Sequence, residues 1–184
     1  IGLYAKDSNV TLTGSTVNLN GDNALGVYLD GTTSFTGAGT INIAGQNIVL
    51  FNMASSGTVT NNFNVGTVAA GSSYSLGNIV NGAFTYTGTT SLGSNGTLMS
   101  GQNSAVYLNG STITANPGAT GVAAIALDGQ YAGTVPVGMT LNTDGENNGI
   151  IALGDGSAGM YGKNGTRLSN LGTVTAGNAS AGIM

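Results

Sequence analysis

Several residue types that carry chemistry are absent from this chain. It contains no histidine and no cysteine among its 184 residues. Without them there is no Ser-His-Asp triad, no Cys-His dyad and no usual zinc site. A glycine-rich phosphate loop followed by lysine and a hydroxyl residue is also missing, so nucleotide binding has no support. These absences predict a protein that is not an enzyme and that holds no metal or cofactor.

Charge is scarce as well. Charged residues make up 5% of the chain, against about 25% in ordinary soluble proteins. The three cations, Lys6, Lys163 and Arg167, are too few to bind a phosphate backbone, and the net charge is -4, so no nucleic-acid partner is expected. The same scarcity disfavours docking on an anionic membrane. No apolar run of about 18 residues is present, so the segment is not expected to insert into a bilayer.

What the chain does contain is a repeated phrase with a period of about 23 or 24 residues. A small residue, an aliphatic residue and an aromatic residue recur in this order, with valine first in one copy and methionine last in another. Longer gaps fit two turns plus an insertion. A fixed period in this range indicates stacked structural repeats. The copies are Gly2-Leu3-Tyr4, Gly26-Val27-Tyr28, Val49-Leu50-Phe51, Ala105-Val106-Tyr107, Gly159-Met160-Tyr161 and Gly182-Ile183-Met184.

A second phrase alternates apolar and polar residues between these copies. Val17 and Leu19 would face one way and Thr16 and Asn18 the other, which is the pattern of a half-buried strand. Asn-Gly and Asp-Gly pairs supply tight corners between the strands. The pattern predicts an all-β parallel β-helix of about eight turns, a rod of roughly 40 Å. An antiparallel sandwich with two-residue hairpin loops is the alternative.

Two stretches depart from the period. Residues 71–96 are expected to form an extruded loop or hairpin, and a weaker insertion is expected near 129–136. Insertions on a solenoid lie on one face and often carry recognition. The aromatic residues in these stretches are therefore the predicted receptor contacts: Tyr74, Phe84, Tyr86 and Tyr131.

The remaining polar and aromatic candidates have structural interpretations. Asp30, Asp128 and Asp155 precede glycine and are interpreted as corner residues, although paired carboxylates could cleave polysaccharides. The acidic stretch 144–148 is interpreted as a solvated turn, with a weak Ca²⁺ site as the alternative. The aromatic residues of the first phrase are expected to form a ladder that holds the register, although a row of rings could also stack on sugars. Irregular Thr-x-Thr spacing disfavours an ice-binding face.

Three phrases resemble the passenger repeats of large type V autotransporter adhesins, and the likeness is nearest to the fusobacterial type. They are Asn-Ala-Leu-Gly-Val-Tyr-Leu-Asp-Gly (23–31), Ser-Ala-Gly-Met-Tyr-Gly-Lys-Asn-Gly (157–165) and the final 14 residues, 171–184. The resemblance covers the regular parts at both ends of the chain and the middle only loosely.

The resemblance implies a location and a function. Such passengers are right-handed β-helices on the cell surface, exported through a C-terminal outer-membrane barrel, and they attach to receptors on host cells or other bacteria. The chain begins with Ile1, without an initiator methionine or a signal-peptide pattern, so residues 1–184 are expected to be one β-helix segment of a longer passenger. A polysaccharide-binding or polysaccharide-degrading β-helix and a passive stalk are the alternatives.

Overall fold

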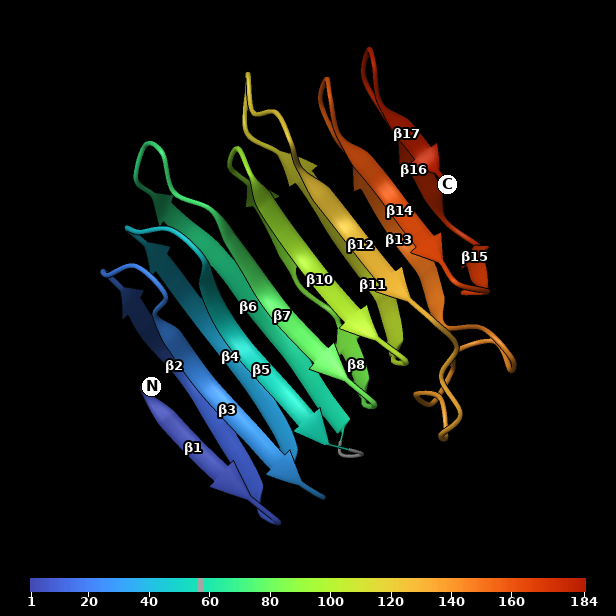
Figure 1. The fold of residues 1–184 in the computed structure, drawn as a ribbon. Coiled ribbons are helices and arrows are strands. Elements are labelled where there is room, and N and C mark those ends of the chain that lie inside the picture. Colours follow the sequence, from blue (N-terminus) through green and yellow to red (C-terminus); the bar gives the residue numbers. More distant parts are fainter. Residues whose placement is uncertain (56–57) are drawn as a thin grey trace.

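Every regular element is a β-strand in the computed structural model, which describes residues 1–55 and 58–184. The chain winds into a β-solenoid of about seven turns, close to the eight expected. Figure 1 shows the strands stacked along one axis, with the N-terminus at one end of the stack and the C-terminus at the other. The described residues contain no helix long and apolar enough to span a membrane.

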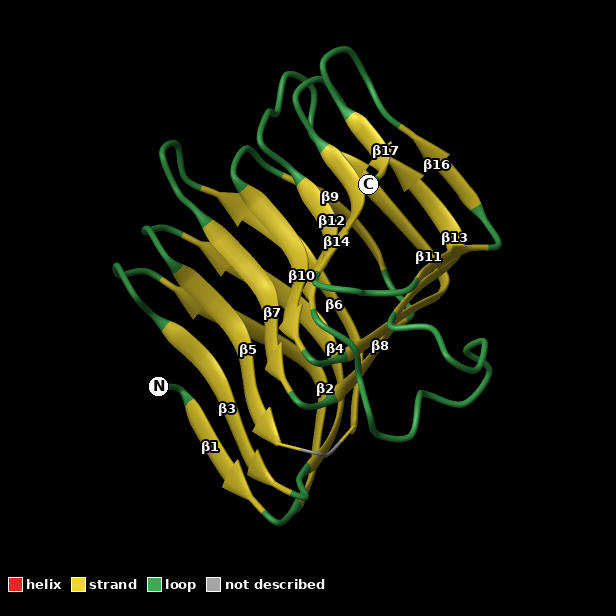
Figure 2. Ribbon diagram, turned by 45° about the vertical axis from the view of Figure 1, so that its right-hand side comes forward, coloured by secondary structure: helices red, strands yellow, loops and turns green. Residues whose placement is uncertain are grey.

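The strands form two parallel sheets, and the chain passes from one sheet to the other as it winds (Figure 2). The first sheet contains, in order, β1 (Leu3–Lys6), β3 (Leu25–Gly31), β5 (Ile48–Ser55), β7 (Tyr74–Val80), β10 (Gly96–Gln102), β12 (Ala123–Asp128), β14 (Ala158–Lys163) and β17 (Ala181–Ile183). The second contains β2 (Asn9–Leu19), β4 (Ser34–Ile43), β6 (Thr58–Val68), β8 (Ala83–Tyr86), β9 (Thr89–Leu92), β11 (Ala105–Ala115), β13 (Gly145–Ala152), β15 (Leu168–Asn170) and β16 (Thr173–Thr175).

Two long strands of the second sheet, β2 and β11, contain a glycine where their pairing shifts register. Residues 10–13 and 16–19 are continuous in β2. The strand bends at Gly14, which has a φ of 62° and lies where the pairing with β4 shifts register. Gly110, with the same φ, marks a similar shift in β11, so the Asn109-Gly110 pair forms a bulge instead of a corner.

Register explains which side chains form the core. Leu29 lies opposite Met53, which lies opposite Ile79, and all three are fully buried between the sheets. Each such side chain contributes about 1.5–3 kcal/mol through burial. A single turn could not bury these residues, because their neighbours in this column come from the turns before and after.

Residues 71–96 do not form an extruded loop, so that expectation was wrong. β7, β8, β9 and the start of β10 lie in this range, and all four are paired within the sheets. The sequence looks irregular because aromatic rings join the aliphatic side chains in this part of the core. Phe51 packs against Phe35, Phe63 and Phe84, with ring centroids 4.8, 5.9 and 6.4 Å away.

Two similar phrases of the sequence, 57–59 and 66–68, begin nine residues apart. Gly57 lies outside the described residues, and residues 58–68 form β6. The described part of both phrases therefore belongs to one long strand and not to two turns of the solenoid.

The aromatic ladder is shorter than expected. Tyr4 lies opposite Tyr28, and the two rings stack with centroids 5.7 Å apart and planes 12° apart. Phe51 lies opposite Val27, one residue out of phase with the alignment of the phrases, and therefore points into the core. Tyr107 belongs to the second sheet, opposite Thr85 and Glu146. The register ladder is thus confirmed for the first pair and wrong for Phe51 and Tyr107.

Two columns of corner residues turn the chain between the sheets. Left-handed backbone conformations, which asparagine, aspartate and glycine tolerate best, recur at equivalent positions of successive turns. The first corner follows the first sheet and contains Asp7, Gly31, Asn81, Asn103, Gly129 and Asn164, with φ from 47° to 86°. The second corner precedes the first sheet and contains Asn23, Asn47, Asn95, Gly121, Gly156 and Ala179, with φ from 51° to 68°.

Candidate functional site

A long loop connects β12 to β13. An insertion was expected near 129–136, and the structure shows one that continues to Asp144 before β13 begins at Gly145. Figure 2 shows it extending away from the stacked turns, whereas the other connections are short. We call residues 129–144 the side loop.

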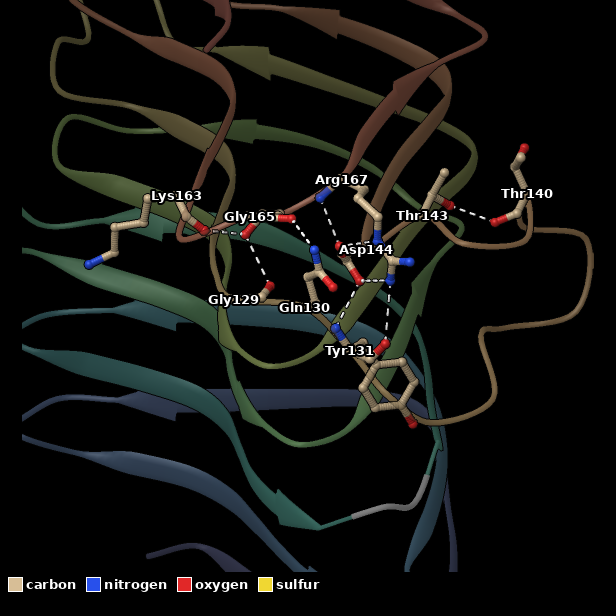
Figure 3. A network of polar contacts seen from close by, with 10 residues as sticks. Gly129, Gln130, Tyr131, Thr140, Thr143, Asp144, Lys163, Gly165 and Arg167 are labelled. Atoms are coloured by element: carbon tan, nitrogen blue, oxygen red, sulfur yellow. Dashed lines mark hydrogen bonds and ion pairs between the residues drawn. The ribbon is translucent and has the colours of Figure 1, made fainter.

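Asp144 fixes the first arm of the side loop. Its carboxylate is fully buried and accepts a hydrogen bond from the backbone N–H of Tyr131 at 2.8 Å. Arg167, at the start of the next turn, donates from its backbone N–H at 2.7 Å, from Nε at 2.9 Å and from Nη2 at 2.7 Å (Figure 3). The stem of the loop is therefore attached to the following turn by a bidentate, charge-assisted contact between Arg167 and Asp144.

Opposing effects act on the Asp144 carboxyl. Burial raises its pKa, but the hydrogen bonds from the Arg167 side chain and from the two backbone N–H groups, together with the Arg167 charge, outweigh burial and hold the pKa below its ordinary value. Asp144 therefore remains ionised at neutral pH, as its contact with the guanidinium requires.

Glu146 fixes the second arm. Its Oε2 accepts a hydrogen bond from the backbone N–H of Thr140 at 2.9 Å, and the hydroxyl of Thr143 donates to the carbonyl of Thr140 at 2.6 Å. The Glu146 side chain is fully buried, and its Oε1 has no partner in the part of the chain that the structure describes. The acidic stretch is thus a buried anchor, and the prediction of a solvated turn was wrong.

Apolar side chains of the side loop pack against the outer face of the second sheet. Met139 packs there with Ala83, Ala105 and Tyr107, and Tyr131 and Val135 are partly buried against this cluster. Two other apolar side chains of the loop face solvent: Val137 is 99% exposed and Leu141 is 77% exposed. The loop is therefore held at its base and presents apolar side chains outward.

Two hollows flank Tyr131. One, of about 620 Å³, lies within the side loop and reaches Arg167. The other, of about 290 Å³, lies between the loop and the first corner and is lined by Asn81, Asn103 and residues 130–133. Tyr131 lines both and is partly exposed.

Three of the four predicted receptor contacts were wrong. Tyr74, Phe84 and Tyr86 are buried, since β7 and β8 place them between the sheets. The Tyr86 hydroxyl donates to the carbonyl of Phe63 at 3.0 Å, and burial raises the pKa of Tyr74 to about 12. Only Tyr131 lies where a partner could reach it.

The sequence analysis chose only aromatic residues as receptor contacts and therefore missed the aliphatic and amide side chains of the candidate site. Val137 and Leu141 belong to the insertion, and the long step between Asp128 and Lys163, which pair across adjacent strands, was the signal for it. Asn81 and Asn103 lie at corners of the solenoid, with φ values of 57° and 47°, and neither was among the predicted candidates.

The candidate carboxylates do not form a catalytic pair. Asp30 and Asp128 occupy one column, but four strand spacings separate them, roughly 19 Å, whereas glycosidase pairs lie about 5–9.5 Å apart. Asp155 lies at the other corner, where Oδ1 accepts the N–H of Asn178 at 2.6 Å, so it does not share a column with Asp30 and Asp128. In the described ranges no three residues of the types His, Cys, Asp and Glu gather to hold a metal ion.

Each corner aspartate has partners of its own instead. Asp30 accepts the N–H of Gly31 at 2.8 Å and lies 3.8 Å from the ammonium group of Lys6. Asp128 lies 2.9 Å from the ammonium group of Lys163 and accepts a hydrogen bond from the Asn164 amide at 2.6 Å. These contacts link successive turns and agree with the interpretation of both aspartates as corner residues.

No protein-family model matches this chain, and comparisons with curated proteins and with solved structures gave no match.

Proposed function

We propose that this chain is a segment of a surface-displayed adhesin, in which the β-solenoid is a rigid scaffold that holds the side loop out for attachment to host cells or other bacteria. The observation that carries the proposal is the combination of a buried, hydrogen-bonded base and exposed apolar side chains in residues 129–144. The resemblance of the repeat phrases to autotransporter passengers supports a position on the cell surface.

The anchoring of the loop favours recognition over a simple connection. Corners elsewhere in the solenoid need only a few residues between strands, such as the two between β1 and β2. The side loop is far longer, yet Asp144 and Glu146 hold it at both arms through Tyr131 and Thr140. A loop fixed before binding loses less conformational entropy when a partner arrives, so its contacts contribute more to affinity.

The presence of many copies of the side loop on one cell would also favour attachment. A solenoid is stiff because each turn pairs with its neighbours, and a cell displays many copies of one passenger. Weak contacts at one loop can then be multiplied about 100-fold or more by multivalent binding. The scarcity of cations, with only Lys6, Lys163 and Arg167 in the chain, directs the expected partner away from nucleic acid and anionic lipid.

The test is attachment of cells that display the full parent protein. Substituting Val137→Asn and Leu141→Asn together should lower attachment strongly and leave the fold intact, because both side chains project into solvent. Leu171→Asn is the matched control, since Leu171 is also well exposed but lies between β15 and β16. Unchanged attachment, both for the double variant and for a parent whose residues 132–138 are replaced by a Gly-Ser linker, would make this segment a passive stalk.

A further inference from the structure

The hollow between the side loop and the first corner has the lining of a ligand site. It encloses about 290 Å³ and is lined by Asn81, Asn103 and the run Gln130-Tyr131-Ala132-Gly133. Three of these six residues carry amide side chains, one carries an aromatic ring, and none is charged. The amides come from three successive turns of the solenoid: Asn81 and Asn103 occupy equivalent corners, and Gln130 follows the corner of the next turn. The rigid stack therefore spaces the two asparagines at about one strand separation, 4.8 Å.

The two corner asparagines differ from their equivalents in the same column. At two other corners of this column the side chain forms a hydrogen bond to a neighbouring turn. Asp7 Oδ1 accepts the N–H of Thr32 at 2.9 Å, and the Asn164 amide donates to Asp128 at 2.6 Å. Asn81 and Asn103 are exposed and line the hollow. Neither side chain makes a hydrogen bond to another residue of the ranges 1–55 and 58–184. Both amides are therefore placed where a ligand in the hollow can meet them.

Tyr131 supplies the apolar part of the hollow. One side of the residue packs on the cluster around Tyr107 and Met139, while its ring points away from the Asp144–Arg167 pair (Figure 3). Burial raises the pKa of its hydroxyl, which therefore stays protonated at neutral pH and has no partner among the described residues. A side chain at position 133 would collide with this ring, so Gly133 lets the loop backbone pass close beside it.

The polar groups around the ring are neutral and can both donate and accept. Gln130 uses Nε2 to donate to the carbonyl of Gly165 at 2.9 Å, which fixes the side chain and leaves its amide oxygen to accept. Amides can donate to one hydroxyl of a ligand and accept from another. A phosphate or carboxylate ligand would need cations that the lining lacks.

We propose that this hollow binds a neutral sugar residue, with a C–H face of the sugar against the Tyr131 ring and its hydroxyls hydrogen-bonded by Asn81, Asn103 and Gln130. This rests on the proposed function, because it names a class of ligand for the same side loop. A glycan on a host or bacterial surface would supply such a residue. An apolar protein partner at Val137 and Leu141 is the competing outcome of the test.

The experiment measures sugar binding by the chain of 184 residues with saturation-transfer NMR and a glycan array. The panel contains neutral hexoses, N-acetylhexosamines and their oligosaccharides, with sialylated and sulfated forms as charged comparators. The variant pair Asn81→Gly and Asn103→Gly removes both amides while glycine keeps the left-handed backbone, whose φ values are 57° and 47°. Asn23→Gly with Asn47→Gly, the same change at the second corner, is the matched control.

The expected result is binding of at least one neutral glycan, weakened about tenfold or more by the Asn81/Asn103 pair, as loss of well-placed hydrogen bonds predicts. The control pair should bind within about twofold of the parent chain. Tyr131→Leu should also abolish the signal, while far-ultraviolet circular dichroism shows that the sheets are retained.

Two results would overturn the inference: no glycan of the panel binds, or the two asparagine pairs lose binding equally. If sugar binding is absent but attachment still depends on Val137 and Leu141, the adhesive loop stands and its ligand is a protein surface. If sugar binding is present but cell attachment ignores the loop, the sugar site stands and the proposed function fails.

Discussion

The N-terminal turns and the turns around the side loop are stacked alike but held together differently. Around β4 to β8 four phenylalanine rings, Phe35, Phe51, Phe63 and Phe84, pack together between the sheets. Around β13 and β15 an inward position is occupied by Asn147, whose Nδ2 donates to Asn170 Oδ1 at 2.8 Å. One backbone path thus accepts either non-directional apolar packing or directional polar contacts.

The difference has a consequence for stability. In a solenoid each turn contacts only its neighbours, so the effect of a substitution is concentrated near its own turn. The phenylalanine region should respond to lost volume, whereas the loop region should respond to lost charge or altered pH. The following predictions test this division.

The largest effect is expected in the phenylalanine region. Phe51→Ala should lower the free energy of unfolding by about 3–5 kcal/mol, because the ring is fully buried and touches three others, which would leave a cavity. Chemical denaturation measures the loss, and Phe51→Leu should lose clearly less. A loss below about 1 kcal/mol for the alanine variant would show that the rings do not form a tight core.

A smaller and more local effect is expected at the loop base. Arg167→Met should cost about 2–3 kcal/mol, because it leaves the buried Asp144 carboxylate without its cation, and the guanidinium is partly exposed in the parent. Hydrogen exchange should rise at Tyr131 and across the side loop and not around Phe51. Replacing both partners, Asp144→Leu with Arg167→Met, should recover part of the loss; no recovery would contradict the pair as its origin.

The loop base should also respond to acid. Since the folded pKa of Asp144 lies below its unfolded value, its stabilising contribution is present above the unfolded pKa, about 3.9, and is lost as the pH falls through the folded pKa. Exchange at the side loop should rise below about pH 4, while the phenylalanine region keeps its protection. The pKa of Asp128 is lowered too, chiefly by Lys163 and then by Asn164, so the measurement belongs in an Asp128→Asn background. Asp144→Asn should abolish the response.

The smallest effects are expected at the second corner, and they have opposite signs. Ala179 has a φ of 51° and Asn95 a φ of 57°, a conformation that costs a residue with a Cβ roughly 1 kcal/mol. Ala179→Gly should raise the free energy of unfolding by up to about 1 kcal/mol, and Asn95→Ala should lower it by a similar amount. Thermal melts of both variants check this. Equal signs would show that backbone conformation is not what selects residues in this column.

The sequence predicted the solenoid because its signals are short and repeated. Period-two alternation placed Leu19 inward, and the Asp-Gly pair at 30–31 marked a corner, as the structure confirms. Phe51 was predicted on the wrong face because aligning the repeated phrases does not reveal a shift of one residue in strand pairing. Such a shift moves a side chain from the surface to the core. The register came only from the pairing of Phe51 with Val27.

The site was harder to predict than the fold. Aromatic residues in an irregular stretch suggested a loop at 71–96, but a core with space for rings produces the same irregularity. Asp144 and Glu146 were interpreted as solvated because no local sequence pattern shows that Arg167 donates hydrogen bonds to Asp144 and that the backbone N–H of Thr140 donates to Glu146. Contacts between distant turns carry that information.

The side loop leaves the pairing on either side of it undisturbed. Before it, Asp128 lies opposite Lys163, and after it, Gly145 lies opposite Leu168, each in regular parallel register. The insertion therefore changes the length of the chain without changing the stacking of the rod. A foreign peptide placed between Ala132 and Gly138 would inherit the same two fixed stems, which makes this position a display site into which new binding sequences can be grafted.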